Sequence, residues 1–266
     1  KSRCLTAFCA LCYFLSFFVI SFVIFEKVCY NKKDYFIERI STNHTKTELE
    51  YAIDLKTILD IHHIKRSEIE GAIISSVVPQ ITNAAKLAVE KILKKEPMVL
   101  GPGVKTGLNI VLDNPGEMGA DRVADAVAAL AQYPVPLVIV DMGTATTISV
   151  LDDKKRYIGG MIMPGVRISL DALTSRASQL SGISIEEPKR IIGRNTVDCM
   201  KSGILYGNAA AVDGIVDRIE DELGQKVTVI ATGGMSKKII PHCKREMIWD
   251  GDLLLKGLQI IYDKNK

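Results

Sequence analysis

The stretch from residue 138 to residue 152 constrains the fold of this chain most strongly, and it reads VIVDMGTATTISVLD. Two runs rich in β-branched residues flank a turn of small residues, 143–146, which predicts a β-hairpin. Such a turn lets backbone N–H groups approach a polyphosphate, and Asp141 at the end of the first strand is placed to hold a cation beside it. A buried strand and an ordinary turn, with Asp141 bonding its own backbone, explains the same letters.

Composition limits the classes of protein to consider. The chain has 266 residues, of which 47% are hydrophobic, enough for one large domain or two modest ones. Its 34 basic and 31 acidic side chains leave a net charge of +3, without a basic block, so we expect no nucleic-acid partner. Of the six cysteines only Cys9 and Cys12 form a CxxC, with no second pair to complete a metal site, and all six are interpreted as reduced thiols.

The N-terminal segment, 1–25, differs from the rest of the chain. Residues 4–25 carry no charge, glycine or proline and hold six of the seven phenylalanines. This run is long enough to cross a bilayer as a helix, with Lys1 and Arg3 before it. Three interpretations stay open: a signal anchor, a secretory segment, or out-of-frame sequence that replaces a soluble strand hairpin.

The remaining sequence alternates strands and helices in two rounds. Residues 47–61 predict an amphipathic helix behind a Thr-x-x-Glu start, and 71–78 predict a buried strand that ends at Pro79. Further along the chain we expect helix 81–93, loop 101–107, helix 121–133, hairpin 137–151, strand 157–163, helices within 166–180 and 195–223, strand 227–231 and a helix from Asp252. The element order of the second round suggests half of a duplicated fold, with halves at 26–133 and 134–266.

Gly119-Ala120-Asp121-Arg122 places a carboxylate and a guanidinium at a helix start. Asp121 could accept a proton from a substrate hydroxyl while Arg122 or the helix N-terminus steadies negative charge. A helix N-cap explains Asp121 as well.

Two further turns are candidates for ligand contacts. Thr232-Gly233-Gly234 follows an apolar strand, and its bare backbone suits a flat nucleobase or ribose, although a plain strand-to-helix turn fits equally. Asn195-Thr196 opens the long helix, where capping accounts for both residues.

Taken in order, the segments GPGVKTG, GADR, DMGTATT, GGMIMPGV, NTVDCMKSGILYG with DGIVDRI, and ATGG resemble type III pantothenate kinases, over about residues 36–262. The resemblance implies an α/β protein with a duplicated ribonuclease-H-like fold, as in actin, hsp70 and the acetate and sugar kinases, in two domains with mixed sheets. It implies a cytoplasmic homodimer that phosphorylates pantothenate with ATP, the first step toward coenzyme A.

The resemblance also implies roles for individual residues. Asp121 would be the general base on the pantothenate hydroxyl, and Asp141 would bind an activating monovalent cation, potassium or ammonium, while Mg²⁺ would arrive with ATP. The remaining positions divide between pantothenate (Gly119, Ala120, Arg122 and Thr196) and ATP (Gly143, Thr144, Gly233 and Gly234).

The chain departs from the family in one respect. The family opens with an Asp-x-Gly-Asn-Thr hairpin that forms its first phosphate cradle, whereas this chain has no glycine before Gly71 and no aspartate before Asp34. We therefore expect little or no kinase activity from the chain as written. The alternative is a membrane-tethered, catalytically inactive homologue that acts as a binding or regulatory protein, and it has a membrane partner only if residues 4–25 are genuine. The third hypothesis is a related kinase whose substrate is another small acid or a sugar.

Overall fold

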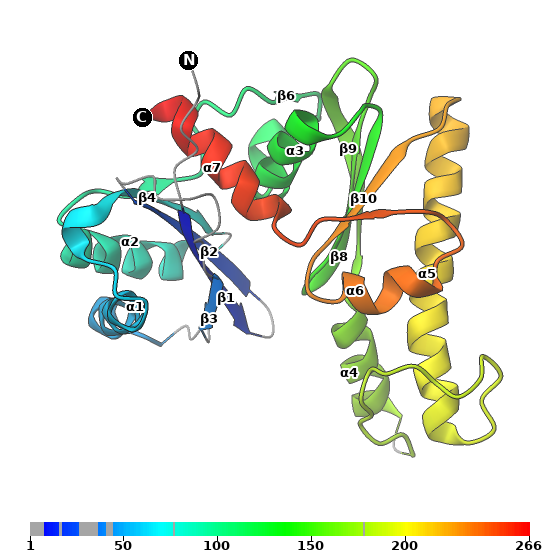
Figure 1. Cartoon of the computed structure of the whole chain (residues 1–266). Helices are drawn as coiled ribbons and strands as arrows, with labels where there is room; N and C mark the ends of the chain where they lie inside the picture. The colour runs from blue at the N-terminus through cyan, green and yellow to red at the C-terminus, as the bar shows by residue number, and fades with distance from the viewer. Residues whose placement is uncertain (1–7, 16–17, 27–36, 41–44, 77, 178) are drawn as a thin grey trace. The chain divides into compact units, whose positions relative to one another are not determined.

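The computed structural model divides the chain into two compact units (Figure 1). Unit 1 comprises Lys1–Gly107, Gly116–Val127 and Leu254–Lys266, and unit 2 comprises Leu108–Pro115 and Ala128–Leu253. The structure describes residues 8–15, 18–26, 37–40, 45–76, 78–177 and 179–266. The expected halves, 26–133 and 134–266, follow the element order, whereas the compact units place the C-terminal helix with unit 1 and residues 108–115 with unit 2.

Unit 1 contains a five-stranded sheet in the order β3-β1-β2-β4-β5. Its strands are β1 (Phe8–Leu15), β2 (Phe18–Glu26), β3 (Ile37–Ile40), β4 (Ile69–Ser76) and β5 (Met98–Val99). Helices α1 (Glu48–Ile61) and α2 (Pro79–Leu93) pack on each other and share a core with β4. Ile73 and Ile74 point to opposite faces of β4 and both are fully buried, which accounts for the uninterrupted apolar sequence of this strand.

The start of α1 confirms the Thr-x-x-Glu prediction. The Thr47 hydroxyl accepts the backbone N–H of Glu50 at 3.3 Å, and the Glu50 carboxylate accepts the N–H of Thr47 at 2.7 Å. This reciprocal capping satisfies two N–H groups that a helix end leaves without partners. Beyond the cap, Tyr51, Leu55 and Leu59 form the buried face.

The C-terminal helix α7 (Leu253–Asn265) holds several parts of unit 1 together. A methyl group on Gly257 would overlap the backbone of Ala124 in helix α3 (Ala120–Gln132), so the two helices approach at backbone contact. At the other end of α7, the Asn265 amide accepts the N–H of Lys105 and donates to the Lys105 carbonyl, both at 2.9 Å. The loop 101–107 is thereby fastened to the end of the chain.

Unit 2 contains a six-stranded sheet in the order β11-β10-β7-β8-β9-β6. Its strands are β6 (Asn109–Ile110), β7 (Leu137–Met142), β8 (Ala145–Leu151), β9 (Arg156–Pro164), β10 (Thr228–Thr232) and β11 (Ile248–Trp249). Strands β7, β8 and β9 form an antiparallel meander, and β10 runs parallel to β7. The predicted hairpin and the strand after it are therefore confirmed.

Helices α4 (Val166–Arg176) and α5 (Thr196–Leu223) share a core with β7 and β8, and the short α6 (Ser236–Ile239) packs on α5. Asn195 caps α5 by accepting the N–H of Asp198 at 2.9 Å, and Gly224 ends the helix in a left-handed conformation with φ of 66°. The capping interpretation of Asn195 is confirmed. Three 3-10 turns complete the described elements: Arg66–Glu68, Pro115–Glu117 and Ile240–His242.

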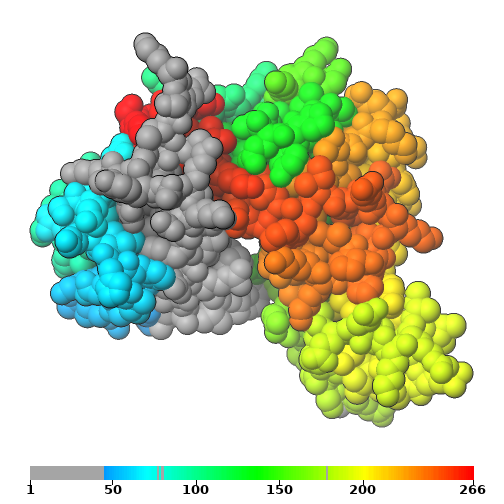
Figure 2. Space-filling model, viewed as in Figure 1, coloured from blue at the N-terminus to red at the C-terminus, as the bar shows by residue number. Residues whose placement is uncertain are grey.

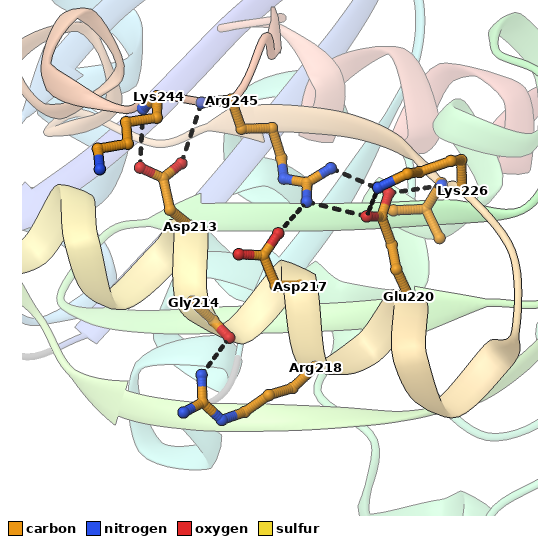
Figure 3. Close-up of polar contacts among 9 residues, drawn as sticks. Asp213, Gly214, Asp217, Arg218, Glu220, Lys226, Lys244 and Arg245 are labelled. Carbon is orange, nitrogen blue, oxygen red and sulfur yellow. Dashed lines mark hydrogen bonds and ion pairs between the residues drawn. The ribbon is translucent and has the colours of Figure 1, made fainter.

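An ionic cluster fixes the segment before β11 on α5 (Figure 3). The Asp213 carboxylate accepts the backbone N–H groups of Lys244 and Arg245, and Glu220 accepts both terminal nitrogens of Arg245 at 2.9 Å. Lys226 donates to Glu220 at 2.7 Å. Burial by itself would raise the pKa of Glu220, but these hydrogen bonds lower the pKa to about 2.

Both units contain a mixed sheet, as a duplicated fold requires, but the strands of the two sheets pair differently. In unit 2 the strand next to β10 is β7, the first strand of its meander, and it runs parallel to β10. In unit 1 the strand next to β4 is β2, the second strand, and it runs antiparallel to β4. The first two strands of unit 1 have therefore exchanged places relative to unit 2, in the region that lacks the Asp-x-Gly-Asn-Thr segment.

The N-terminal apolar run is extended where the structure describes it. Strands β1 and β2 pair antiparallel from Phe8 with Phe25 to Leu15 with Phe18, so the described part of this run consists of strands and not of the helix that its length would allow. Residues 1–7 and 16–17 of the expected segment lie outside the described residues. None of the helices in the described ranges combines the length and apolar character needed to span a membrane.

Candidate functional site

The ends of β7 and β10 bring two of the predicted turns to one edge of the unit 2 sheet. Asp141 pairs with Thr232 in the parallel register of these strands. The N–H of Met235 donates to the carbonyl of Met142 at 3.1 Å and joins the two turns. Because both strands end here, the turn after β7 and the Thr-Gly-Gly turn after β10 are neighbours, as ligand sites at the carboxyl ends of parallel strands require.

Gly233 approaches the Asp141 carboxylate more closely than any side chain would permit. A Cβ on Gly233 would overlap Asp141 Oδ1 and lie 2.7 Å from the backbone nitrogen of Met142, and the φ of Gly233 is +86°. A Cβ on Gly143 would lie 3.6 Å from the same carboxylate oxygen. The half-buried Asp141 carboxylate therefore lies between two stretches of glycine backbone, where no side chain of these glycines covers it.

The N-terminus of α4 lies against the turn 143–144. Gly165 is the N-cap of α4, and a Cβ there would overlap the Thr144 carbonyl oxygen and lie 2.8 Å from the Gly143 oxygen. The positive end of the helix dipole is therefore next to the turn to which the resemblance assigns the ATP phosphates.

The Gly-Ala-Asp-Arg segment lies in unit 1, at the start of α3. The helix begins at Ala120, so Asp121 is in its first turn and not at the predicted N-cap position. The Asp121 carboxylate accepts the N–H of Arg122 at 2.8 Å, and both side chains are half-buried. Gly119 precedes the helix, and its carbonyl accepts the N–H of Val123 at 3.1 Å. A carboxylate in this position is stabilised by the helix dipole.

Thr196 is exposed as the first residue of α5. It adjoins the loop 179–194, which with the start of α5 forms a lobe at one end of unit 2 (Figure 2). Within unit 2, Figure 1 shows β10 and α6 beside the middle of α5, away from that lobe. The predicted residues therefore fall into three sets. Residues 119–122 lie in unit 1, and Thr196 lies by itself in unit 2. The third set, also in unit 2, gathers at the ends of β7 and β10: Asp141, Gly143, Thr144, Gly233 and Gly234.

Several polar residues near the strand ends were not predicted. The buried Ser236 hydroxyl donates to the Gly233 carbonyl at 2.6 Å, and it accepts the indole N–H of Trp249 at 3.1 Å. Asp250, also buried, accepts the Tyr133 hydroxyl at 2.8 Å, and burial together with this bond raises the pKa of Tyr133 to about 12. The Ser next to a Gly-Gly turn was the one available sequence signal, since serine commonly bonds nearby backbone.

The described residues hold no group of three or more His, Cys, Asp or Glu side chains arranged for a metal ion. The Asp141 carboxylate lies next to the backbone of Gly143 and Gly233, and the carbonyl oxygens of Gly143 and Thr144 face Gly165. Hard oxygen donors of this kind suit cations that prefer carboxylate and carbonyl ligands.

Known structures similar to this chain include the inorganic polyphosphate/ATP-glucomannokinase of an Arthrobacter strain, at 11% identity and a TM-score of 0.43 over 97% of this chain and 99% of that one. The acetate kinase of Entamoeba histolytica aligns at 10% identity and a TM-score of 0.41, over 86% of this chain and 83% of that one. Both TM-scores lie below 0.5, so the family assignment depends on the sequence relatives.

The family model for type III pantothenate kinase matches residues 22–218. The type III pantothenate kinase of Halalkalibacterium halodurans is 46% identical over 227 residues, which cover 85% of this chain and 89% of the relative. That of Bacillus cytotoxicus is 48% identical over 227 residues, covering 85% and 87%. This chain belongs to the type III pantothenate kinase family.

Proposed function

We propose that the fold and the candidate site of this chain serve the ATP-dependent phosphorylation of pantothenate to 4'-phosphopantothenate, the first step of coenzyme A biosynthesis. The observation that carries the proposal is the close approach of Gly233 to the Asp141 carboxylate, at the adjoining ends of β7 and β10, in a chain of this family. Phosphoryl transfer requires little covalent chemistry from the protein. It requires two anions held together, a base on the attacking oxygen and cations that spread the charge.

Asp121 is the proposed general base. Its carboxylate, in the first turn of α3, accepts the proton of the pantothenate primary hydroxyl as that oxygen attacks phosphorus. Arg122 and the helix N-terminus stabilise the negative charge of the reacting groups. Gly119 and Ala120 have small side chains or none, which leaves room for the main chain of the substrate. Thr196 is proposed as a further pantothenate contact.

The ATP contacts are proposed for unit 2. Gly143 and Thr144 offer a narrow turn to the phosphates next to the N-terminus of α4, and Gly233 with Gly234 offer bare backbone to the adenosine. Mg²⁺ accompanies ATP in kinases. A monovalent cation, potassium or ammonium, is proposed for Asp141 with the carbonyl oxygens of the same turn, where it would neutralise part of the phosphate charge.

We further propose a cytoplasmic homodimer as the working form. Homodimers are the most common oligomers of soluble proteins, and the family resemblance implies this state. Light scattering of the purified chain at several concentrations tests it.

The experiment compares the chain as written with a variant in which the N-terminal hairpin carries the family's Asp-x-Gly-Asn-Thr segment. Phosphorylation of pantothenate by Mg·ATP is measured for both, with and without potassium. We expect little or no turnover from the first and clear, potassium-stimulated turnover from the second. Absence of any gain on restoration, with nucleotide bound and the fold intact, would contradict the proposed function.

A further inference from the structure

Two hydrogen bonds in series connect the Thr-Gly-Gly turn to an exposed aromatic ring. The hydroxyl of Ser236, a fully buried residue, donates to the carbonyl of Gly233 and accepts the indole N–H of Trp249. Trp249 ends β11 and pairs with Ala231 of β10, so its backbone is held in the same sheet as the turn. The indole is thereby fixed in orientation beside the proposed adenosine contact.

The indole of Trp249 has two different neighbours. Gly251 packs against the six-membered part of the ring so closely that a methyl group on this glycine would lie 2.8 Å from Cη2. The ammonium of Lys237 lies over the ring, 4.0 Å from its centroid. Trp249 is nevertheless 45% exposed, which is unusual for the largest apolar side chain. One neighbour is rigid backbone, and the other is the end of a flexible, exposed side chain.

We propose that the indole of Trp249 is the stacking surface for the purine base of ATP, and that Lys237 occupies this surface until the base displaces it. The inference rests on the proposed function, because it extends the adenosine contact of Gly233 and Gly234. A ring that hydrogen bonds fix in place is preorganised for stacking, so little freedom is lost when the base arrives.

The relative strengths of the two contacts favour the exchange. An exposed ammonium over an indole is a weak contact, equivalent to an affinity change of about two- to fivefold. A base stacked on an aromatic side chain is stronger, equivalent to about tenfold or more. After it is displaced, the Lys237 ammonium lies next to a nucleotide that carries several negative charges, and these charges attract it.

Trp249 is also the single tryptophan of the chain, so its fluorescence reports on this ring alone. The full chain is titrated separately with Mg·ATP, adenosine and inorganic triphosphate, both as written and with the restored N-terminal hairpin. We expect Mg·ATP and adenosine to change the emission, and inorganic triphosphate to leave it unchanged, because only the first two carry the base.

Calorimetry with adenosine measures the same contact in variants. Trp249→Val is expected to weaken binding about tenfold, Trp249→Phe to keep it within about threefold, and Lys237→Met to strengthen it about two- to fivefold. The matched control is Ile248→Ala, since Ile248 is the 41% exposed neighbour of Trp249 on β11 and points to the other side of the strand. Its affinity and emission response are expected to remain those of the parent.

Three results overturn the inference: unchanged affinity in Trp249→Val, an equal emission change with inorganic triphosphate, or no binding of adenosine and ATP to either form of the chain. The proposed function fails by a different result. If the base-dependent response is present but the restored chain does not phosphorylate pantothenate, the nucleotide contact stands and the assigned acceptor is wrong.

Discussion

At the scale of single residues, the candidate site depends on a position where only glycine fits. Gly233 combines a positive φ with contact to Asp141 and the Met142 backbone, whereas Gly234 beside it has open space where a Cβ would point. Both are glycine in the same turn, so the sequence does not distinguish the two. Their difference arises from β7, which pairs with β10 in the sheet although its paired residues lie 91 positions earlier in the chain.

Gly233→Ala is expected to lower the free energy of unfolding by about 2–4 kcal/mol, because it adds left-handed strain to a backbone clash. Gly234→Ala is the control, with an expected change within about 0.5 kcal/mol. Urea unfolding measures both. Equal stabilities for the two variants would show that the turn does not approach Asp141 as described.

Asp121→Asn in the hairpin-restored chain is expected to reduce kcat about 10²- to 10⁴-fold, the usual contribution of a general base, with little change in KM for pantothenate. Asparagine keeps an oxygen that can accept the Arg122 N–H, so α3 should begin normally. Asp153→Asn, at an exposed residue of the turn after β8, is the control and should retain the parent kcat. Undiminished turnover in Asp121→Asn would remove this residue from the reaction.

At the scale of elements, α7 stabilises unit 1 through contacts at both of its ends. Gly257 meets Ala124 of α3 near the start of α7, and Asn265 pairs with the backbone of Lys105 at the end. Lys264 adds a hydrogen bond to the Thr106 carbonyl at 2.9 Å. The glycine-rich loop 101–107 thus depends on the last turn of the chain for its conformation.

Asn265→Leu removes both bonds to Lys105 and is expected to accelerate exchange of the Lys105 amide hydrogen by about 5- to 30-fold, because each hydrogen bond is worth about 1 kcal/mol. Asn265→Asp keeps an acceptor for the Lys105 N–H and should show a smaller effect. Asp263→Asn alters only an exposed ion pair with Lys266 and is the control. Unchanged exchange in Asn265→Leu would mean that the loop holds its shape without α7.

At the scale of the whole molecule, stability should depend on pH through buried carboxylates of unit 2. Hydrogen bonds lower the pKa of Glu220 to about 2, and the pKa of Asp152 is also lowered, because bonds from Arg156 outweigh the effect of burial. A depressed carboxyl pKa contributes stability that is fully present above the unfolded value, near 4.5 for glutamate, and is lost as the pH falls toward the folded value.

We therefore expect the free energy of unfolding to be level from pH 7 to about pH 5 and to fall steadily below it. Arg245→Met removes the main partner of Glu220, so it should destabilise the chain by about 3 kcal/mol at pH 7 and flatten the acid slope. Arg218→Met is the control, because that guanidinium bonds the Gly214 carbonyl of its own helix (Figure 3). Parallel pH profiles for Arg245→Met and the parent would contradict this role of the cluster.

Local chemistry allowed much of the fold to be predicted. Thr47 with Glu50 indicated where α1 begins, Asn195 where α5 begins, and the small residues of DMGTATT where β7 turns into β8, because each signal acts within a few residues. The order of strands in unit 1 could not be predicted in this way. A strand offers the same backbone groups to a parallel or an antiparallel neighbour, so the pairing of β2 with β4 depends on the whole sheet.

Short motifs and local periodicity were enough to identify the family, the α/β class and the residue types of the proposed site, because each of these signals is contained in a few neighbouring residues. Three contacts became known only from the three-dimensional arrangement: Gly233 touches Asp141, Ser236 joins this turn to Trp249, and α7 packs on α3. Each of these contacts joins residues distant in the chain, and close packing selects such partners through the shape of the complete unit.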